Sequence, residues 1–238
     1  MEAYIFRHGE TSYQQGKVCL SEAHDLTPEG ISTVNNSSSE LAKKLDPSLP
    51  VQIHSSPFGR CLHTAKVIKD NLERRGIKAL DIIGDDLIEE IRNFEWELFC
   101  PLVNGGEIEF EGDKFEVDKS LTNPQNLSSV RYLREDLAHK LAEEARKTLP
   151  PKYLRRIASF ERYLSAVNRL NTKVNSLRNR NGEIQILSTH EGLTGRFIEQ
   201  LSGQKEAFLG RGKYFYVRTE GGIIVPETYQ EGAIRVER

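Results

Sequence analysis

Short apolar runs alternate with segments of helical periodicity over the first third of the chain. The runs 3–6, 51–54 and 79–83 have the length and composition of β-strands. Between them, one helix is predicted to begin at Thr27-Pro28, a threonine N-cap followed by proline, and another spans about 57–75 and stops at Gly76. This order of strands and helices is typical of a largely parallel sheet covered by helices.

The alternation is interrupted after residue 98. Apolar and acidic residues alternate on both sides of Glu111-Gly112, which predicts a β-hairpin, and two helices are expected at about 127–148 and 152–179. The regular order then resumes with a strand, a helix and three short strands that complete the sheet, at 183–188, 193–201, 214–217, 223–225 and 233–236. We therefore expect an α/β fold, a three-layer α/β/α sandwich with a mostly parallel central sheet. Residues 1–238 form one domain, with an inserted cap of β-hairpin plus helices at about 98–150.

Polar clusters follow four of the predicted strands. They are Arg7-His8-Gly9, the turn 55–57 that leads to Arg60, the pair Glu89-Glu90, and His190. Since the carboxyl ends of parallel strands meet at one edge of a sheet, we expect these groups to share a crevice. Two arginines and two histidines without metal-ligand spacing suit a phosphate better than a metal ion, and imidazole is a competent nucleophile.

Composition excludes several other classes of protein. The net charge of −2 gives no argument for nucleic acid binding, and no apolar run approaches the length of a membrane span. Three widely spaced cysteines indicate neither a disulfide framework nor a metal site. With no signal peptide before the first strand, we expect a cytoplasmic protein without metal or other cofactor, and we expect neither nucleic acid nor membrane partners.

With these motifs assembled, the chain resembles the histidine phosphatase superfamily, the phosphoglycerate mutase-like proteins. The resemblance rests on four segments in the right order: RHGET from Arg7, LTPEG from Leu26, SSPFGRCLHTA from Ser55 and STHEG from Ser188. It implies that His8 is the nucleophile and forms a phosphohistidine, while Arg7, Arg60 and His190 hold the phosphoryl oxygens. Thr11 and Gln14 would join the substrate-binding set, Gln14 replacing the family's usual asparagine.

The resemblance also implies a carboxylic acid that protonates the leaving group. The segment EIRNFEWEL aligns Glu90 with that acid, and the adjacent Glu89 is the alternative. Phe94 and Leu98 replace the family's glycines around Trp96, and Glu191 stands where the family more often has a small residue. Glu191 would either orient His190 or point to solvent.

A metal-independent phosphatase acting on phosphate monoesters is the function that these observations favour. The loop and the Arg-Arg-x-Tyr segment that help bisphosphoglycerate-dependent mutases retain their bisphosphate are absent, although a mutase-type phosphotransferase stays open. The other alternative is a non-catalytic module that binds phosphate or phosphoproteins. The expected partner is a small phosphorylated substrate, a homodimer is possible, and the substrate itself is not readable from the sequence.

Overall fold

The computed structural model describes residues 2–12, 25–90, 106–110, 113–117, 163–177, 180, 182–202, 207–220, 223–227 and 234–236. It divides into two compact units, Met1–Glu90 with Leu164–Arg238, and Ile91–Tyr163. In the second unit the described part is a hairpin of β4 (Gly106–Phe110) and β5 (Asp113–Val117), paired antiparallel as the alternating sequence predicts. The expected cap at 98–150 lies mainly outside the described residues and stays a prediction.

A six-stranded mixed sheet forms the centre of the first unit, in the order β3-β2-β6-β1-β8-β9. The strands β3 (Ile83–Gly84), β2 (Val51–Ser55), β6 (Ile184–Thr189) and β1 (Glu2–Arg7) run parallel to one another. β8 (Tyr214–Glu220) is antiparallel to β1 and β9 (Ile223–Glu227) is antiparallel to β8. The predicted α/β class with a mostly parallel sheet is confirmed.

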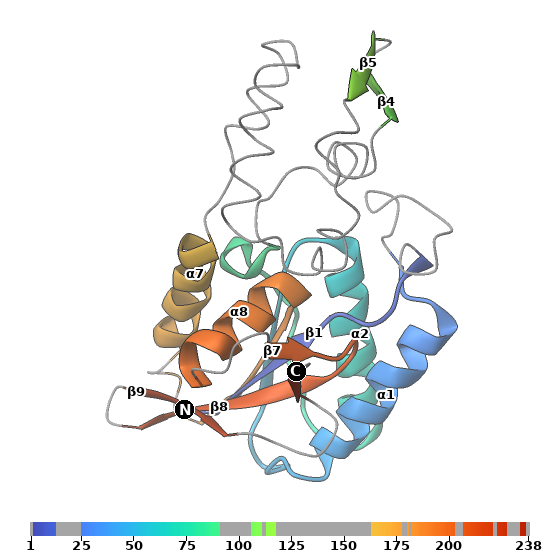
Figure 1. Ribbon diagram of the computed structural model, residues 1–238. Helices are drawn as coiled ribbons and strands as arrows, with labels where there is room; N and C mark the ends of the chain where they lie inside the picture. The colour runs from blue at the N-terminus through green and yellow to red at the C-terminus, as the bar shows by residue number, and fades with distance from the viewer. Residues whose placement is uncertain are drawn as a thin grey trace. The chain divides into compact units, whose positions relative to one another are not determined.

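Helices cover both faces of this sheet. α1 (Pro28–Ala42) and α2 (Gly59–Arg74) lie on one side, and α7 (Tyr163–Ser176) and α8 (Glu191–Ser202) lie on the other (Figure 1). Alternate strand residues divide between the faces, as the pleat requires. Tyr4 and Phe6 of β1 belong to the core that α1 and α2 close, whereas Phe215 of β8 packs on Phe197 of α8 with 6.0 Å between ring centroids.

The third and the last predicted strands differ from the expectation. Of 79–83, Ala79 makes a single bridge to Val51, and the strand proper begins at Ile83. Between these two points the Gln52 side chain donates a hydrogen bond to the carbonyl of Asp81 at 2.7 Å. The last strand, β10 (Ile234–Val236), pairs with β7 (Ala207–Leu209) in a separate two-stranded sheet rather than completing the central one.

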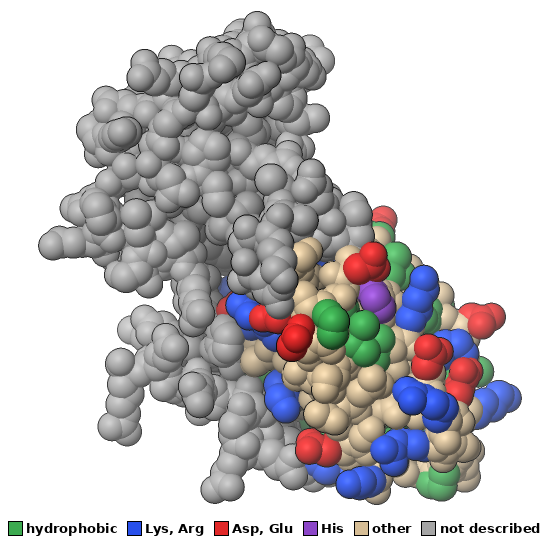
Figure 2. Space-filling model, turned by 90° about the vertical axis from the view of Figure 1, so that its right-hand side faces the viewer, with side chains coloured by type: hydrophobic (Ala, Val, Ile, Leu, Met, Phe, Trp, Pro, Cys, Tyr) green, Lys and Arg blue, Asp and Glu red, His purple; other side chains and the backbone are tan. Residues whose placement is uncertain are grey.

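Charged side chains of both signs are interspersed over the face of the molecule shown in Figure 2. Among the described residues, this face therefore carries no extended patch of one sign. No helix in the described part of the chain is both long enough and apolar enough to cross a membrane.

Candidate functional site

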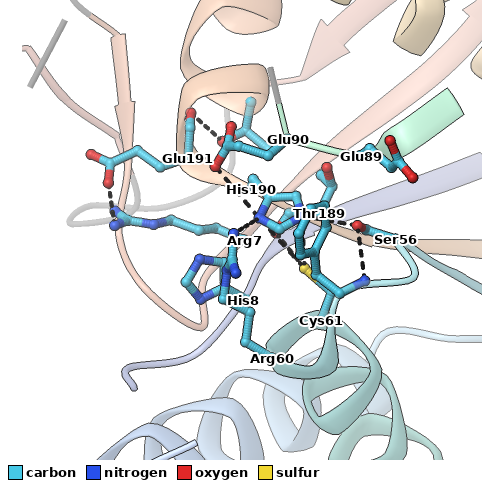
Figure 3. Close-up of polar contacts among 12 residues, drawn as sticks. Arg7, His8, Ser56, Arg60, Cys61, Glu89, Glu90, Thr189, His190 and Glu191 are labelled. Carbon is cyan, nitrogen blue, oxygen red and sulfur yellow. Dashed lines mark hydrogen bonds and ion pairs between the residues drawn. The ribbon is translucent and has the colours of Figure 1, made fainter. Parts of the chain in front are cut away.

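The polar clusters that follow β1, β2 and β6 converge at the carboxyl edge of the sheet. β6 lies between β1 and β2, and all three are parallel, so Arg7, Ser55 and Thr189 end at the same edge. Arg60 joins them from the first turn of α2 and His190 follows β6 directly (Figure 3). The four residues predicted from the sequence as a phosphate site, Arg7, His8, Arg60 and His190, are all buried and lie together.

The backbone of the Arg7-His8-Gly9 segment is held on three sides. The amide of His8 donates to the Thr189 carbonyl at 2.9 Å, and the amide of Gly9 donates to Thr64 Oγ1 at 3.1 Å. Gly9 is also closely packed, because a Cβ there would lie 3.0 Å from the Gly30 carbonyl oxygen, a contact that fits only if a neighbour shifts. The segment that carries the candidate nucleophile is therefore fixed before any ligand arrives.

The LTPEG segment supports the same loop from below. Thr27 caps α1 by accepting the Gly30 amide at 3.0 Å, and its own amide donates to the Glu10 carbonyl at 2.9 Å. The backbone of Glu10 crosses directly over Gly30, where a side chain would collide with it. The RHGET and LTPEG segments thus hold each other in place through these backbone contacts.

His8 is held as a neutral imidazole with a defined tautomer. Its Nδ1 lies 2.8 Å from the Gly9 carbonyl oxygen, and because a carbonyl only accepts, Nδ1 carries the hydrogen. Burial, with the nearby charges of Arg60 and Arg7, holds the pKa of His8 well below its ordinary value of 6.5. The lone pair is then on Nε2, which is the form that a nucleophilic histidine requires.

His190 is also neutral and is oriented by two neighbours. Arg60 Nη2 donates to its Nδ1 at 3.0 Å, so Nε2 carries the hydrogen and donates to Ser56 Oγ at 2.9 Å. Burial and the charge of Arg60 lower the pKa of His190 well below 6.5. Its ring meets that of His8 edge-on, with 5.5 Å between the centroids, so the two imidazoles are direct neighbours.

Arg7 is engaged by a carboxylate of the protein itself. Its Nη1 donates to the Leu209 carbonyl at 2.8 Å, and its Nη2 forms an ion pair with Glu191 Oε2. Figure 3 shows the Glu191 carboxylate turned toward the Arg7 guanidinium and away from the His190 ring. Neither sequence expectation for Glu191, orientation of His190 or exposure to solvent, describes this contact.

Glu90 and Glu89 point in different directions. Glu90 Oε2 lies 3.4 Å from His190 Nδ1, whereas the Glu89 carboxylate points away from this ring (Figure 3). Glu90 therefore lies within the cluster, as the alignment predicts. Of the other predicted binding residues, Thr11 is buried and bridges to Leu26, and Gln14 lies outside the described residues.

Several residues of the cluster carry no motif that the sequence could reveal. Arg211, in the turn before β8, pairs with Glu10 Oε1 at 3.0 Å, and its charge contributes to the lowered pKa of His8. The next residue, Gly212, donates its amide to the carbonyls of Arg7 and His8, each at 3.1 Å, and has a φ of 64° that favours glycine. The signal in the sequence would have been Gly-Arg-Gly before a strand, which is too common to interpret.

Cys61 lies against the second histidine. Its Sγ is 3.3 Å from His190 Nε2, and it is a buried free thiol. Burial raises the pKa of Cys61 to about 12, which keeps the sulfur protonated and unreactive. Among the described residues, no three His, Cys, Asp or Glu side chains are placed to share a metal ion.

A third buried histidine, His54 of β2, lies outside this cluster. Lys173 Nζ donates to its Nδ1 at 3.0 Å, and its Nε2 donates to Gln185 Oε1 at 3.1 Å. Burial and the Lys173 charge lower the pKa of His54 to about 4. Lys173 also pairs with Asp85 at 2.5 Å, so this network joins α7 to the end of β3.

Acidification is expected to destabilise the fold through His54. Because the folded-state pKa is depressed, the unfolded chain binds a proton below pH 6.5 that the folded chain refuses until about pH 4. As the pH is lowered across this window, the free energy of unfolding should decrease by up to about 1.4 kcal/mol per pH unit for each such histidine. Urea unfolding at pH 7, 6 and 5 measures this slope.

A His54→Gln variant is the matched comparison for that slope. The slope of its free energy of unfolding against pH should be smaller by the contribution of one titrating group. The contributions of His8 and His190 should remain. Identical slopes in the variant and the parent chain would contradict the prediction.

The comparisons with known proteins agree with this geometry. Residues 3–99 match the model of the histidine phosphatase superfamily (branch 1), so the resemblance seen in the sequence motifs is confirmed. The match covers the segments that carry Arg7, His8, Arg60 and Glu90 and stops before His190. No curated protein matches the chain by sequence.

Solved structures of similar fold include mutases and phosphatases. Phosphoglycerate mutase from Bacillus anthracis has a TM-score of 0.59 at 16% identity, covering 96% of this chain and 92% of that one. A mycobacterial glucosyl-3-phosphoglycerate phosphatase in complex with VO3 has a TM-score of 0.55 at 15% identity, covering 98% and 99%. A variant of phosphoserine phosphatase from Entamoeba histolytica, in complex with phosphoserine, has a TM-score of 0.54 at 17% identity, covering 95% of both chains. At identities this low, the structural similarity establishes the shared fold and nothing more specific.

Proposed function

We propose that this chain, whose residues 3–99 match the histidine phosphatase superfamily, is a metal-independent phosphatase that hydrolyses phosphate monoesters through a phosphohistidine on His8. One observation carries the proposal. His8 is a buried neutral imidazole with its lone pair on Nε2, in a cluster with two guanidiniums and a second imidazole. A module that only binds phosphate has no need of a nucleophile in this protonation state.

In the first step, His8 Nε2 attacks the phosphorus in line with the ester oxygen. The N–P bond forms as the P–O bond to the alcohol breaks. Arg7 and Arg60 hold the phosphoryl oxygens and stabilise the charge that spreads over them in the transition state, and His190 joins them by donating from Nε2 in place of its hydrogen bond to Ser56 Oγ. The burial of these groups supports the assignment, since fixed charges act more strongly where water is excluded.

The departing alcohol oxygen takes a proton from the Glu90 carboxyl group. In the second step, water attacks the phosphohistidine and gives its proton to the Glu90 carboxylate, while the P–N bond breaks and inorganic phosphate leaves. The side chain of Glu90 is the acid favoured over that of Glu89 because it lies 3.4 Å from His190. Glu90 thus donates a proton in the first step and accepts one in the second.

The test of the function is a substrate screen with the purified protein. It compares p-nitrophenyl phosphate, sugar phosphates, nucleotides, phosphoglycerates, glucosyl-3-phosphoglycerate, phosphoserine and phosphopeptides, with the mutase reaction assayed alongside. We expect phosphate release that EDTA does not inhibit, and an acid-labile phosphoenzyme trapped during turnover. Release that requires a metal, or mutase activity without hydrolysis, would refute the proposal.

Glu90→Gln is expected to separate substrates by their leaving group. Loss of a general acid slows esters of aliphatic alcohols by about 10²-fold or more, whereas p-nitrophenolate leaves without protonation and is slowed far less. The measurement is kcat for p-nitrophenyl phosphate and for an alkyl phosphate. Glu89→Gln is the matched control, with both rates near those of the parent chain; a reversed pattern would assign the acid to Glu89.

A further inference from the structure

We propose that Arg169 of α7 is the positioning residue that holds Glu90 at the site. The inference rests on the proposed function, because it assigns the residue through which the acid is aimed. The charge of Arg169 contributes to the lowered pKa of His190, but its hydrogen bonds point to a different role. It acts on the backbone of the turn that carries Glu90.

The Arg169 guanidinium binds four carbonyl oxygens of one turn. Nη1 donates to Asp86 at 3.1 Å and to Leu87 at 2.9 Å, and Nη2 lies 3.4 Å from the carbonyl oxygens of both Glu89 and Glu90. A planar guanidinium with several N–H donors is suited to such a fork of acceptors. Arg169 therefore holds the backbone of Glu90 itself as well as that of the residues before it.

The carbonyl that Arg169 skips is bound from the other side. Thr189 Oγ1 donates to the Ile88 carbonyl at 2.6 Å, and Thr189 directly precedes His190. All five carbonyls from residue 86 to residue 90 are thereby engaged. The turn is fixed to β6 on one side and to α7 on the other, and these two anchors set where the Glu90 side chain begins.

The turn has little strength of its own. It is a single 3-10 turn, Asp86–Ile88, whose internal backbone hydrogen bonds are long, 3.3 Å from Ile88 to Asp85 and 3.4 Å from Glu89 to Asp86. Short 3-10 turns have poor hydrogen-bond geometry and leave their last carbonyls without intrahelical partners. External donors therefore decide its conformation.

A second contact from α7 holds the start of the same turn. Lys173, four residues after Arg169, pairs with Asp85, whose carboxylate also accepts the Leu87 amide at 2.9 Å. Lys173 is buried, and its loss would leave Asp85 without its cation. Substitution of Lys173 would therefore affect the stability of the fold more than the position of Glu90. Arg169 is half-buried at the rim of the turn, which makes it the better residue to test.

The experiment compares Arg169→Gln with Arg74→Gln. Arg74 is an exposed arginine of α2 that also donates to a backbone carbonyl, that of Asp70, and it lies outside the site. For Arg169→Gln we expect kcat for an alkyl phosphate to fall at least about 30-fold and kcat for p-nitrophenyl phosphate to change less than about threefold. Arg74→Gln should leave both rates unchanged.

The double variant Glu90→Gln with Arg169→Gln provides a readout that a general loss of structure would not move. If Arg169 acts through Glu90, the double variant should be no slower on the alkyl phosphate than Glu90→Gln alone. Losses that multiply, or a loss equal for the two leaving groups, would overturn the inference. Arg169→Lys keeps the charge but loses the forked set of guanidinium donors. It should therefore fold and still lose more activity on the alkyl phosphate than on p-nitrophenyl phosphate. It replaces the Gln variant if circular dichroism shows that variant to be unfolded.

The failure of this inference differs from the failure of the proposed function. A parent chain that releases no phosphate from any ester overturns both. A parent chain that is active, with the expected Glu90→Gln behaviour but an Arg169→Gln variant that matches Arg74→Gln, overturns the role of Arg169 alone.

Discussion

His8→Ala is expected to abolish phosphate release and to eliminate the acid-labile phosphoenzyme together. The methyl group cannot form a bond to phosphorus, and the remaining cationic groups bind the substrate without an attacking atom. Loss of a nucleophile costs about 10³-fold or more in kcat, so turnover should drop to background. Initial rates with p-nitrophenyl phosphate and acid-quench trapping with a ³²P-labelled substrate measure the two losses.

The substrate should still bind to this variant. Arg7 and Arg60 should keep their positions because their contacts to Leu209, Glu191 and His190 remain in this variant. His63→Ala removes a partly exposed imidazole of α2 and is the control, with activity retained. Substantial turnover in His8→Ala would show that the nucleophile has been assigned to the wrong residue.

Gly30→Ala is expected to lower both the stability and the activity, although Gly30 is no part of the catalytic cluster. A Cβ at this position would lie 2.8 Å from the amide nitrogen of Glu10 and closer still to its carbonyl oxygen, both of them backbone atoms. Relief of the overlap has to move the backbone two residues after His8. Overpacking of this kind costs about 1–3 kcal/mol, and a shift of the nucleophile by about 1 Å costs a further 10²-fold in rate.

Gly84→Ala is the matched control for Gly30→Ala. No heavy atom lies within 4 Å of a Cβ at Gly84, so stability should change by less than about 0.5 kcal/mol and activity should not change. Thermal unfolding and kcat are measured for both variants. A Gly30→Ala chain with parental activity would show that the loop adapts without moving His8.

The sequence was sufficient for the fold and for the four buried cationic and imidazole residues. Arg7 ends a strand, His8 and His190 directly follow one, and Arg60 lies in the first turn of a helix, so the sheet edge brings the four together. β7 escaped prediction because three residues are too few to show a period. The partner of β10 escaped because pairing between strands so far apart in the chain leaves no local trace.

The choice between Glu89 and Glu90 needed the structure for a physical reason. Glu89 has extended backbone, with φ of −63° and ψ of 160°, and neighbouring residues in extended chain point to opposite sides. Which of the two faces His190 depends on how the turn is anchored, and the anchors Arg169 and Thr189 lie about 80 and 100 residues away. On the helical wheel of α7, Arg169 is simply a polar residue.

The pairing of Arg7 with Glu191 has a consequence for selectivity among anions. A bare guanidinium attracts chloride, sulfate and phosphate alike, and its occupancy follows the ionic strength. Arg7 carries its own counterion, so a dissolved ion gains little by approaching it. A phosphoryl group that also engages Arg60 and His190 can compete with the carboxylate, whereas an ion that meets Arg7 alone cannot. In the proposed phosphatase, Glu191 would thus compete with dissolved anions for Arg7 and favour an anion that makes several contacts in the site.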